Sequence, residues 1–320
     1  MLDALKFVER ATADKDIIRA LTHICVHDGR LQAGDSKIAL ECTCPELAGH
    51  SFTVAADKFI KAIAVCDGVP KIEILDDSRI KVSHKRFRVT LPTLKVEDYP
   101  RSEMRKSTEI PVPEAFIEAL KRVFPFVSQD ASRPWSLGVW LQDGYACATN
   151  NVTLVRTPID WHGPAINLPR FAIQEILDIK IPITRIFVDG SALEVEYGDA
   201  WFKTQTYTDI WPDSAVQLFN RPMPEMHSVP ADLLKAVEKL IPFCPDVKFP
   251  SIYFKDGAIT TANGAQSAEI GFDFEFTGCY RAEVLQLALS VASEWSPQTY
   301  PQPIFFKGDL IEGMLVGLRP

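Results

Sequence analysis

The chain has 320 residues, 47% of them hydrophobic and 24% charged, which is the balance of a globular protein long enough for two or three domains. Its formal net charge of −8 argues against a protein that binds nucleic acid with its whole surface, because such proteins are basic. No apolar run reaches the length of a membrane span, and no signal-peptide pattern is present. Seven scattered cysteines, none in a Cys-x-x-Cys spacing, indicate buried thiols in a reducing compartment rather than disulfides or zinc ligands.

In chain order, the first third of the sequence predicts four elements. An amphipathic helix is predicted over residues 2–13. Residues 24–29 predict a β-hairpin, because Asp-Gly after alternating apolar residues is the strongest short hairpin signal. A second helix contains Ile60 and Ile63, and a second hairpin turns at Asp76.

The same elements recur twice more, in the same order, at intervals of roughly 110 residues. The matching segments are 112–120 and 229–237 for the first helix, 139–144 and 252–257 for the Asp-Gly hairpin, Ile173 with Ile176 and Val284 with Leu287 for the second helix, and the turn at Asp189 for the second hairpin. A single Asp-Gly pair would be a weak signal, but three at regular spacing predict a repeat architecture.

The repeat predicts three α+β domains with antiparallel sheets, because hairpins join neighbouring strands in opposite directions. Polar stretches at 101–109, which is flanked by Pro100 and Pro111, and at 220–228, which contains two prolines, separate the copies. We therefore predict domains over residues 1–107, 108–220 and 221–320.

These residues, taken together, resemble one known family, the bacterial DNA polymerase III beta subunit, which is the replicative DNA sliding clamp. The stretches that carry the resemblance are 54–59 (Val-Ala-Ala-Asp-Lys-Phe), 90–92 (Thr-Leu-Pro), 98–100 (Asp-Tyr-Pro), 148–154 (Ala-Thr-Asn-Asn-Val-Thr-Leu) and 314–320 (Met-Leu-Val-Gly-Leu-Arg-Pro). The resemblance covers nearly the whole chain. It implies the DNA-clamp fold, with two helices packed on antiparallel sheets in each of three repeated domains, in a divergent or phage-encoded member.

The resemblance further implies that two copies close into a homodimeric ring around double-stranded DNA. Two helices in each of six domains, about 8–10 Å apart, would line a hole of roughly 25 Å. Non-specific phosphate contacts, with Kd of about 10⁻⁴–10⁻⁶ M, would let such a ring slide. Basic residues on the predicted inner helices are the candidate DNA contacts: Lys6, Arg10, Lys58, Lys61, Lys121, Arg122, Arg170, Lys235, Lys239 and Arg281.

Members of this family bind a DNA polymerase, the clamp loader and other partners through short linear peptides. The peptides enter a hydrophobic pocket between the second and third domains. Carried over position by position, the resemblance assigns this pocket to Thr149, Asn151, Leu154, Pro212, Phe249, Leu315, Val316, Leu318 and Arg319. Asn151-Val152-Thr153 stands where the family has Gly-His-Arg, so the pocket is expected to be retuned.

Two departures from the family pattern affect the elements that would close a ring. The first copy is expected to lack its opening strand, and the third has a shortened final hairpin between residues 304 and 318. An alternative function is therefore a monomeric clamp-like protein that binds replication partners without encircling DNA.

Catalysis is not expected from this sequence. It has no phosphate-binding, dinucleotide-binding, nucleophile-elbow or zinc-protease motif. His23 and His27 lie four residues apart on a predicted strand, where that spacing means only a shared face, so no metal or cofactor is expected. With the family resemblance, the reducing cysteine pattern predicts a cytoplasmic, nucleoid-associated protein.

Overall fold

The structure is a computed structural model that describes residues 1–209, 211–261, 267–273 and 276–319. The chain forms two compact units. Unit 1 comprises Met1–Val112 with Gln174–Thr206, and unit 2 comprises Pro113–Ile173 with Tyr207–Pro320. Helix α4 (Arg170–Asp178) runs through the crossing point at residues 173 and 174.

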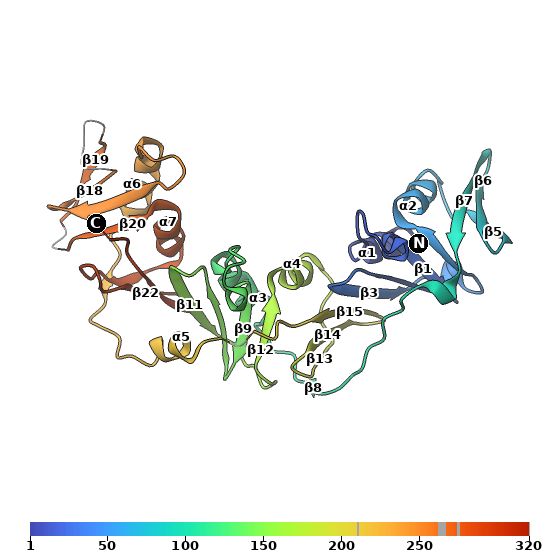
Figure 1. The fold of residues 1–320 in the computed structure, drawn as a ribbon, viewed down its shortest axis with the longest axis horizontal. Coiled ribbons are helices and arrows are strands. Elements are labelled where there is room, and N and C mark those ends of the chain that lie inside the picture. Colours follow the sequence, from blue (N-terminus) through green and yellow to red (C-terminus); the bar gives the residue numbers. More distant parts are fainter. Residues whose placement is uncertain (210, 262–266, 274–275, 320) are drawn as a thin grey trace. The chain divides into compact units, whose positions relative to one another are not determined.

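Unit 1 contains one 11-stranded sheet, and all of its strand pairs are antiparallel. Helices α1 (Leu2–Glu9) and α2 (Ala56–Ala64) contact each other and lie on one side of this sheet (Figure 1). Their buried side chains, such as Leu5, Val8 and Phe59, face the sheet. The strands in spatial order are β5 (Lys71–Asp76), β6 (Arg79–His84), β7 (Phe87–Leu94), β4 (Ser51–Ala55), β1 (His23–His27), β2 (Arg30–Gly34), β3 (Ile38–Thr43), β15 (Ala200–Gln205), β14 (Ala192–Tyr197), β13 (Arg185–Val188) and β8 (Glu109–Ile110).

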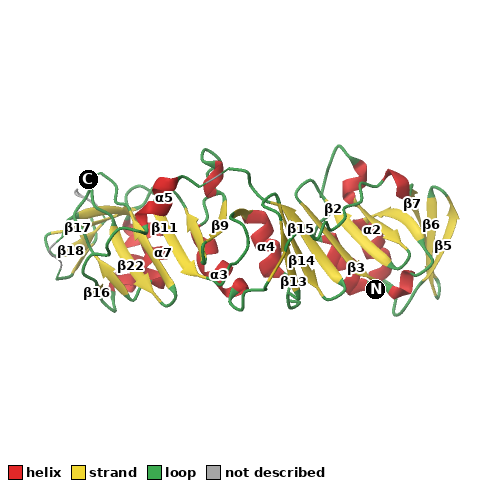
Figure 2. Ribbon diagram, turned by 90° about the horizontal axis from the view of Figure 1, so that it is seen from below, coloured by secondary structure: helices red, strands yellow, loops and turns green. Residues whose placement is uncertain are grey.

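Unit 2 contains an eight-stranded and a four-stranded sheet. Helix α3 (Phe116–Val123) packs on the first sheet, and α6 (Leu233–Leu240) packs on α7 (Ala282–Val291). The first sheet runs β12 (Ile166–Pro169), β9 (Gly138–Gln142), β10 (Tyr145–Thr149), β11 (Thr153–Pro158), β23 (Ile311–Leu315), β22 (Ile304–Gly308), β21 (Glu294–Ser296) and β16 (His227–Ser228). The second runs β19 (Glu269–Gly271), β18 (Ala258–Thr260), β17 (Ser251–Lys255) and β20 (Gly278–Arg281). Figure 2 labels β17 and β18 at the end of unit 2.

The three Asp-Gly turns have the backbone that the sequence predicts. Asp28, Asp143 and Asp256 have φ of 45°, 49° and 53°, and the glycines that follow have φ of 75°, 81° and 75°. Two successive residues with positive φ define the hairpin turn that matches the twist of the flanking strands. The fold class expected from the repeat, two helices and antiparallel strands in each copy, is confirmed.

The segment between the first two copies is fixed to the sheet of unit 1. The buried carboxylate of Glu194 accepts hydrogen bonds from the backbone N–H groups of Arg105 and Lys106, each at 2.9 Å. Gln32 donates to the carbonyl of Ser102 and accepts from its N–H, both at 2.8 Å. Residues 101–106 are therefore a strap held by side chains of β2 and β14.

One further helix, α5 (Asp213–Leu218), was not expected from the sequence. It follows Trp211-Pro212 and packs through Ala215 against Trp140, Leu154 and other buried residues of the sheet. These residues lie on the opposite face of their strands from Leu141 and Val155, because side chains alternate along a strand.

Candidate functional site

The turn between β10 and β11 is held in a single conformation by short polar side chains. The buried Thr149 hydroxyl donates to the carbonyl of Thr153 at 2.8 Å and accepts from the N–H of Asn151 at 3.0 Å. Asn150 accepts from the N–H groups of Val152 and Thr153. Asn151 has φ of 71°, a left-handed conformation that asparagine tolerates better than most residues, which explains how it can stand in place of glycine.

An aromatic cluster lies beneath α5. The Trp211 ring stacks on Trp140 with centroids 6.5 Å apart and meets Trp135 edge-on at 5.4 Å. Leu154 and Met314 face each other across β11 and β23 and complete the buried cluster. Pro212 caps the N-terminus of α5. The helix is therefore anchored on the sheet by three indole rings and by the side chains of Leu154 and Met314.

A hollow of about 180 Å³ opens at the C-terminal end of α5, lined by Trp140, Gln142, Asp143, Tyr145, Cys147, Arg156, Trp211, Val216, Phe219 and Asn220. The Arg156 guanidinium lies between the rings of Tyr145, at 4.4 Å, and Phe219, at 4.6 Å, and pairs with Glu312. Burial raises the pKa of the Cys147 thiol to about 12, so this thiol is uncharged at neutral pH. A second hollow of about 270 Å³ shares Tyr145 and Arg156.

The C-terminal tail leaves the sheet and crosses to β20. Val316 donates its N–H to the carbonyl of Val152 at 2.9 Å, and Leu318 donates to the carbonyl of Cys279 at 2.6 Å. Near this crossing, the Phe249 ring is 48% exposed and contacts the guanidinium of Arg281 at 5.4 Å. Val316 in the tail and Phe249 near it are thus exposed apolar side chains, and backbone hydrogen bonds hold the tail in place.

In the structure, the nine residues predicted for the partner pocket fall into three groups. Thr149, Leu154 and Leu315 are buried and support the turn and the sheet. Asn151 and Pro212 shape the turn and begin α5. Phe249, Val316, Leu318 and Arg319 form the exposed or half-buried part, on or beside the tail.

None of the nine lines the hollow beside α5, and sequence reasoning missed Trp140, Tyr145, Arg156 and Phe219. The alternation of side chains along a strand could have indicated some of these residues from the sequence. Cys147 pairs with Arg156 and Thr149 with Leu154, so these residues share one face.

The ten basic residues predicted to contact DNA fall into two groups. The lysines Lys6, Lys58, Lys61, Lys121, Lys235 and Lys239 are all exposed on helices. Three of them pair with carboxylates of their own helix: Lys58 and Lys61 with Asp57, and Lys121 with Glu118. The four arginines are engaged with other protein groups. Arg10 pairs with Glu175 at 2.9 Å, Arg122 donates to the Thr157 hydroxyl at 3.2 Å, Arg170 donates to the carbonyl of Val127 at 3.1 Å, and Arg281 stacks on Phe249. Arg10 and Arg281 are the residues that flank α1 and α7 rather than members of these helices.

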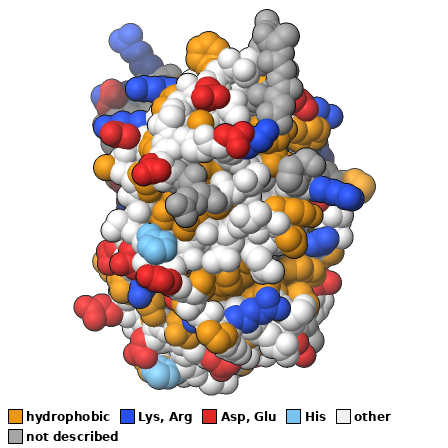
Figure 3. Space-filling model, turned by 90° about the vertical axis from the view of Figure 1, so that its left-hand side faces the viewer, with side chains coloured by type: hydrophobic (Ala, Val, Ile, Leu, Met, Phe, Trp, Pro, Cys, Tyr) orange, Lys and Arg blue, Asp and Glu red, His pale blue; other side chains and the backbone are white. Residues whose placement is uncertain are grey.

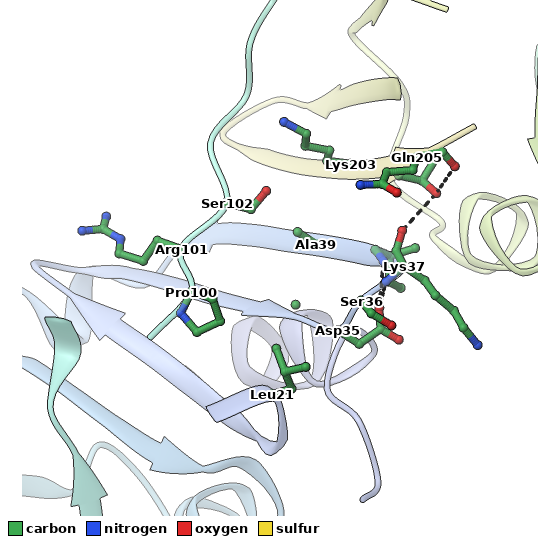
Figure 4. A pocket seen from close by; sticks show the side chains of 13 residues that line it. Leu21, Asp35, Ser36, Lys37, Ala39, Pro100, Arg101, Ser102, Lys203 and Gln205 are labelled. Carbon is green, nitrogen blue, oxygen red and sulfur yellow. Dashed lines mark hydrogen bonds between the residues drawn. The ribbon is translucent and has the colours of Figure 1, made fainter. Parts of the chain in front are cut away.

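A separate hollow of about 260 Å³ lies in unit 1 between Pro100–Ser102 of the strap and strands β3 and β15 (Figure 4). The charged ends of Arg101 and Lys37 point away from it in different directions (Figure 4). Lys203 pairs with Glu194 at 2.9 Å. The charged ends of these three side chains do not point to one place in the hollow. We therefore interpret the hollow as the packing boundary between residues 100–102 and strands β3 and β15, and not as a binding site.

Within the described residues, no group of three or more His, Cys, Asp or Glu side chains is placed to hold a metal ion. None of the described helices is long and apolar enough to cross a membrane. All seven cysteines are free thiols.

Comparison with known proteins identifies the fold. No protein-family model and no curated protein matches the sequence significantly. Solved structures do match. The beta subunit of the Streptococcus pyogenes DNA polymerase superposes with a TM-score of 0.83 at 17% identity, over 100% of this chain and 97% of that one. Caulobacter crescentus pol III beta gives 0.84 at 19%, with the same coverage. The Helicobacter pylori beta clamp, solved with a DNA ligase peptide, gives 0.79 at 17%, over 99% of this chain and 97% of that one. The chain therefore has the fold of bacterial DNA polymerase III beta sliding clamps.

Proposed function

We propose that this chain is a DNA sliding clamp, a non-catalytic processivity factor that encircles duplex DNA as a homodimer and tethers a DNA polymerase and other partners. The fold likeness supports it. The observation that carries it is a repeated strand junction within the chain. Strand β3 of the first copy pairs with β15 of the second, and β11 of the second copy pairs with β23 of the third.

In both junctions, the strand that follows the Asp-Gly hairpin of one copy pairs with the last strand of the next copy. By the same pattern, β19 of the third copy would pair with β7 of the first copy, so these two strand edges are left without a partner by the two junctions within the chain. Strand β19 pairs only with β18, and residues 87–91 of β7 pair only with β6, in the described part of the chain. Two copies of the chain can satisfy both edges at once by joining head to tail, which closes a ring of six domains.

The repeat also predicts the register of this junction. Arg156 faces Glu312 in one existing junction, and Glu41 faces Trp201 in the other. When positions are counted from the Asp-Gly turns and carried to the paired strand, Glu269 in β19 takes the place of Arg156 and Glu41. Counted from the turn of its own hairpin, Arg88 in β7 takes the place of Glu312 and Trp201. Opposite charges would therefore face each other between the copies, as Arg156 and Glu312 do within the chain.

Side-chain exposure supports the same strand pairing. Phe202 of β15 is fully buried, whereas Val89, its counterpart in β7, is only half-buried. Figure 3 faces the end of unit 2 that carries β18 and β19, and hydrophobic side chains are exposed there among acidic and basic ones. A strand from a second copy would cover apolar surface at both edges.

The six exposed helix lysines supply the positive charge that such a ring needs. Each can approach a phosphate as a flexible point charge, and none depends on a particular base. The weak, salt-dependent binding that results permits sliding. Partner binding is proposed for the exposed apolar side chains beside the tail, Val316, Leu318 and Phe249, and for the neighbouring surface at α5.

Topology on DNA tests the function directly. Protein bound to nicked circular DNA and cross-linked at the junction should be retained in high salt and released when the circle is cut. Lys235→Glu with Lys239→Glu should weaken the initial binding for all sequences and reduce its salt slope by about 2. Lys255→Glu, which changes an exposed strand lysine, is the matched control. Equal retention on circular and linear DNA would show ordinary affinity and reject the ring.

The second candidate is a monomeric clamp-like protein that binds replication partners without encircling DNA. It is favoured by the fact that the α5 hollow is lined by residues of unit 2 alone. Peptide binding by a protein that neither dimerises nor stays on circular DNA would support it.

A further inference from the structure

Strand β5 borders the sheet of unit 1 and pairs only with β6 among the described residues. Its counterparts in the other two copies are not edges. Strand β13 is bordered by the short strand β8, and β21 is bordered by the short strand β16. The repeat therefore provides two internal examples of how this edge is filled.

Side-chain exposure differs between β5 and its counterpart β13. In β13, Ile186 faces Ile110 of β8 and is fully buried, and Val188 is 1% exposed. Ile72 takes the place of Ile186, because Ile72 faces Val82 as Ile186 faces Val195. Ile74, the counterpart of Val188, is 49% exposed. An aliphatic side chain in the place of Ile110 would cover these two isoleucines.

The backbone of the same edge is only partly satisfied. Val188 donates its N–H to the carbonyl of Thr108 at 2.9 Å, just before β8. At β5, the carbonyl of Ile72 instead lies 3.2 Å from Nε2 of His50, whose Nδ1 lies 3.2 Å from the carbonyl of Ala48. A neutral imidazole has one N–H, so it can donate to only one of these two acceptors. His50 therefore covers the edge incompletely.

The charges around β5 indicate which residues should precede the aliphatic residue in a segment that pairs with this edge. Strand β8 follows Arg105-Lys106, and Arg105 contributes to lowering the pKa of Asp189, after the larger effects of hydrogen bonds from Ser191 and Ala192. Asp76 of β5 corresponds to Asp189. It pairs with Arg79 at 2.6 Å, and it lines a hollow of about 450 Å³ with Asp77 and Glu97, where Lys95 is the one lysine or arginine of the lining. Basic residues preceding the added strand would meet this acidic end.

We propose that the outer edge of β5 binds an extended segment of a partner protein by strand addition. The segment has basic residues followed by about three extended residues, with an aliphatic side chain opposite Ile72, as in other complexes formed by adding a strand to a sheet edge. The bulge between Ile74 and Asp76 and the flanking charges of Lys71 and Glu73 limit uncontrolled edge pairing, so a short segment fits better than a long strand. The site lies wholly in unit 1 and does not depend on ring closure.

The chain supplies its own probe for this site. A synthetic peptide with the sequence of residues 105–112 (Arg-Lys-Ser-Thr-Glu-Ile-Pro-Val) is titrated into the full-length protein, with a second peptide in which Asp replaces the Ile110 position as control. Saturable submillimolar binding is expected for the first peptide and at least tenfold weaker binding for the second. Hydrogen exchange should slow at the amides of Ile72 and Ile74.

Two variants localise the binding. Ile74→Asp should abolish it, and Met223→Asp, a similarly exposed apolar residue in unit 2, should leave it unchanged. Circular dichroism confirms that both variants are folded. No binding, binding that survives Ile74→Asp, or protection at β13 instead of β5 would each overturn the proposal. A larger species of the protein alone that Ile74→Asp disperses would assign the edge to a second copy of the chain instead.

Discussion

Asn151 is the residue on which the β10–β11 turn depends most. Its φ of 71° places it in the left-handed region, and its side-chain amide donates to the hydroxyls of Ser128, at 3.2 Å, and Ser136, at 3.4 Å. Glycine at this position keeps the backbone and loses only the hydrogen bonds. Alanine loses both, because its Cβ disfavours positive φ.

We therefore predict that Asn151→Ala destabilises the protein more than Asn151→Gly does. The alanine variant should lose about 2 kcal/mol of unfolding free energy from strain and lost hydrogen bonds, and the glycine variant about 1 kcal/mol. Urea unfolding followed by tryptophan fluorescence measures both. An alanine variant as stable as the glycine variant would show that the backbone conformation is not strained.

At the scale of elements, the C-terminal tail and α5 frame the surface proposed for partner peptides. The tail is tied to β11 through Val316 and to β20 through Leu318, so its position is set by backbone hydrogen bonds. Its apolar side chains can therefore serve as fixed walls, as can the half-exposed ring of Phe249.

A short peptide that contains a Gln and ends in a Leu-x-Phe-like sequence, the type that the resemblance to the clamp family implies, should bind this surface. Deleting residues 318–320 or changing Phe249→Ala should weaken binding by about tenfold or more, since a buried apolar anchor typically contributes 2 kcal/mol or more. Phe243→Ala is the matched control, because Phe243 is 63% exposed and lies outside the predicted pocket. Fluorescence anisotropy with labelled peptide measures the change. Equal loss in all three variants would disprove the assignment.

At the scale of the whole molecule, the decisive feature is the pair of edges on β7 and β19 that no other described strand pairs with. The register predicted from the repeat places Arg88 of one copy opposite Glu269 of the other. Arg88→Glu alone should therefore weaken the dimer, and Glu269→Arg alone should do the same, because like charges directly opposite destabilise paired strands.

The double variant Arg88→Glu with Glu269→Arg should restore the dimer, since it exchanges the two charges and keeps their attraction. Sedimentation velocity over a broad concentration range distinguishes the dimer from the 35.8 kDa monomer. A wild-type protein that stays monomeric at tens of micromolar rejects the ring. A dimer that is indifferent to all three variants rejects the register.

The repeated elements follow from local features of the sequence. Asp28-Gly29 and its two counterparts predict hairpins because positive φ at two successive residues is a local property of those residue types. The helices containing Ile60, Ile173 and Val284 follow from apolar spacing, which is also local. The three-copy order could therefore be predicted without coordinates, and the resemblance of five stretches to a known family implied the clamp fold.

The way these elements pack against one another depends on long-range contacts that local sequence patterns do not contain. Helix α5 has six residues, too few for a periodic signal, and it exists because Trp211 and Ala215 pack on Trp140 and Leu154. The arginines among the predicted DNA contacts are engaged by partners distant in sequence, such as Glu175 for Arg10, and no local pattern contains that information. The open edge of β5 likewise becomes visible only beside the filled edges of β13 and β21. Hydrogen bonding between strands and burial between elements are long-range, so the sequence predicts which elements form, and packing decides which of their faces remain free to bind.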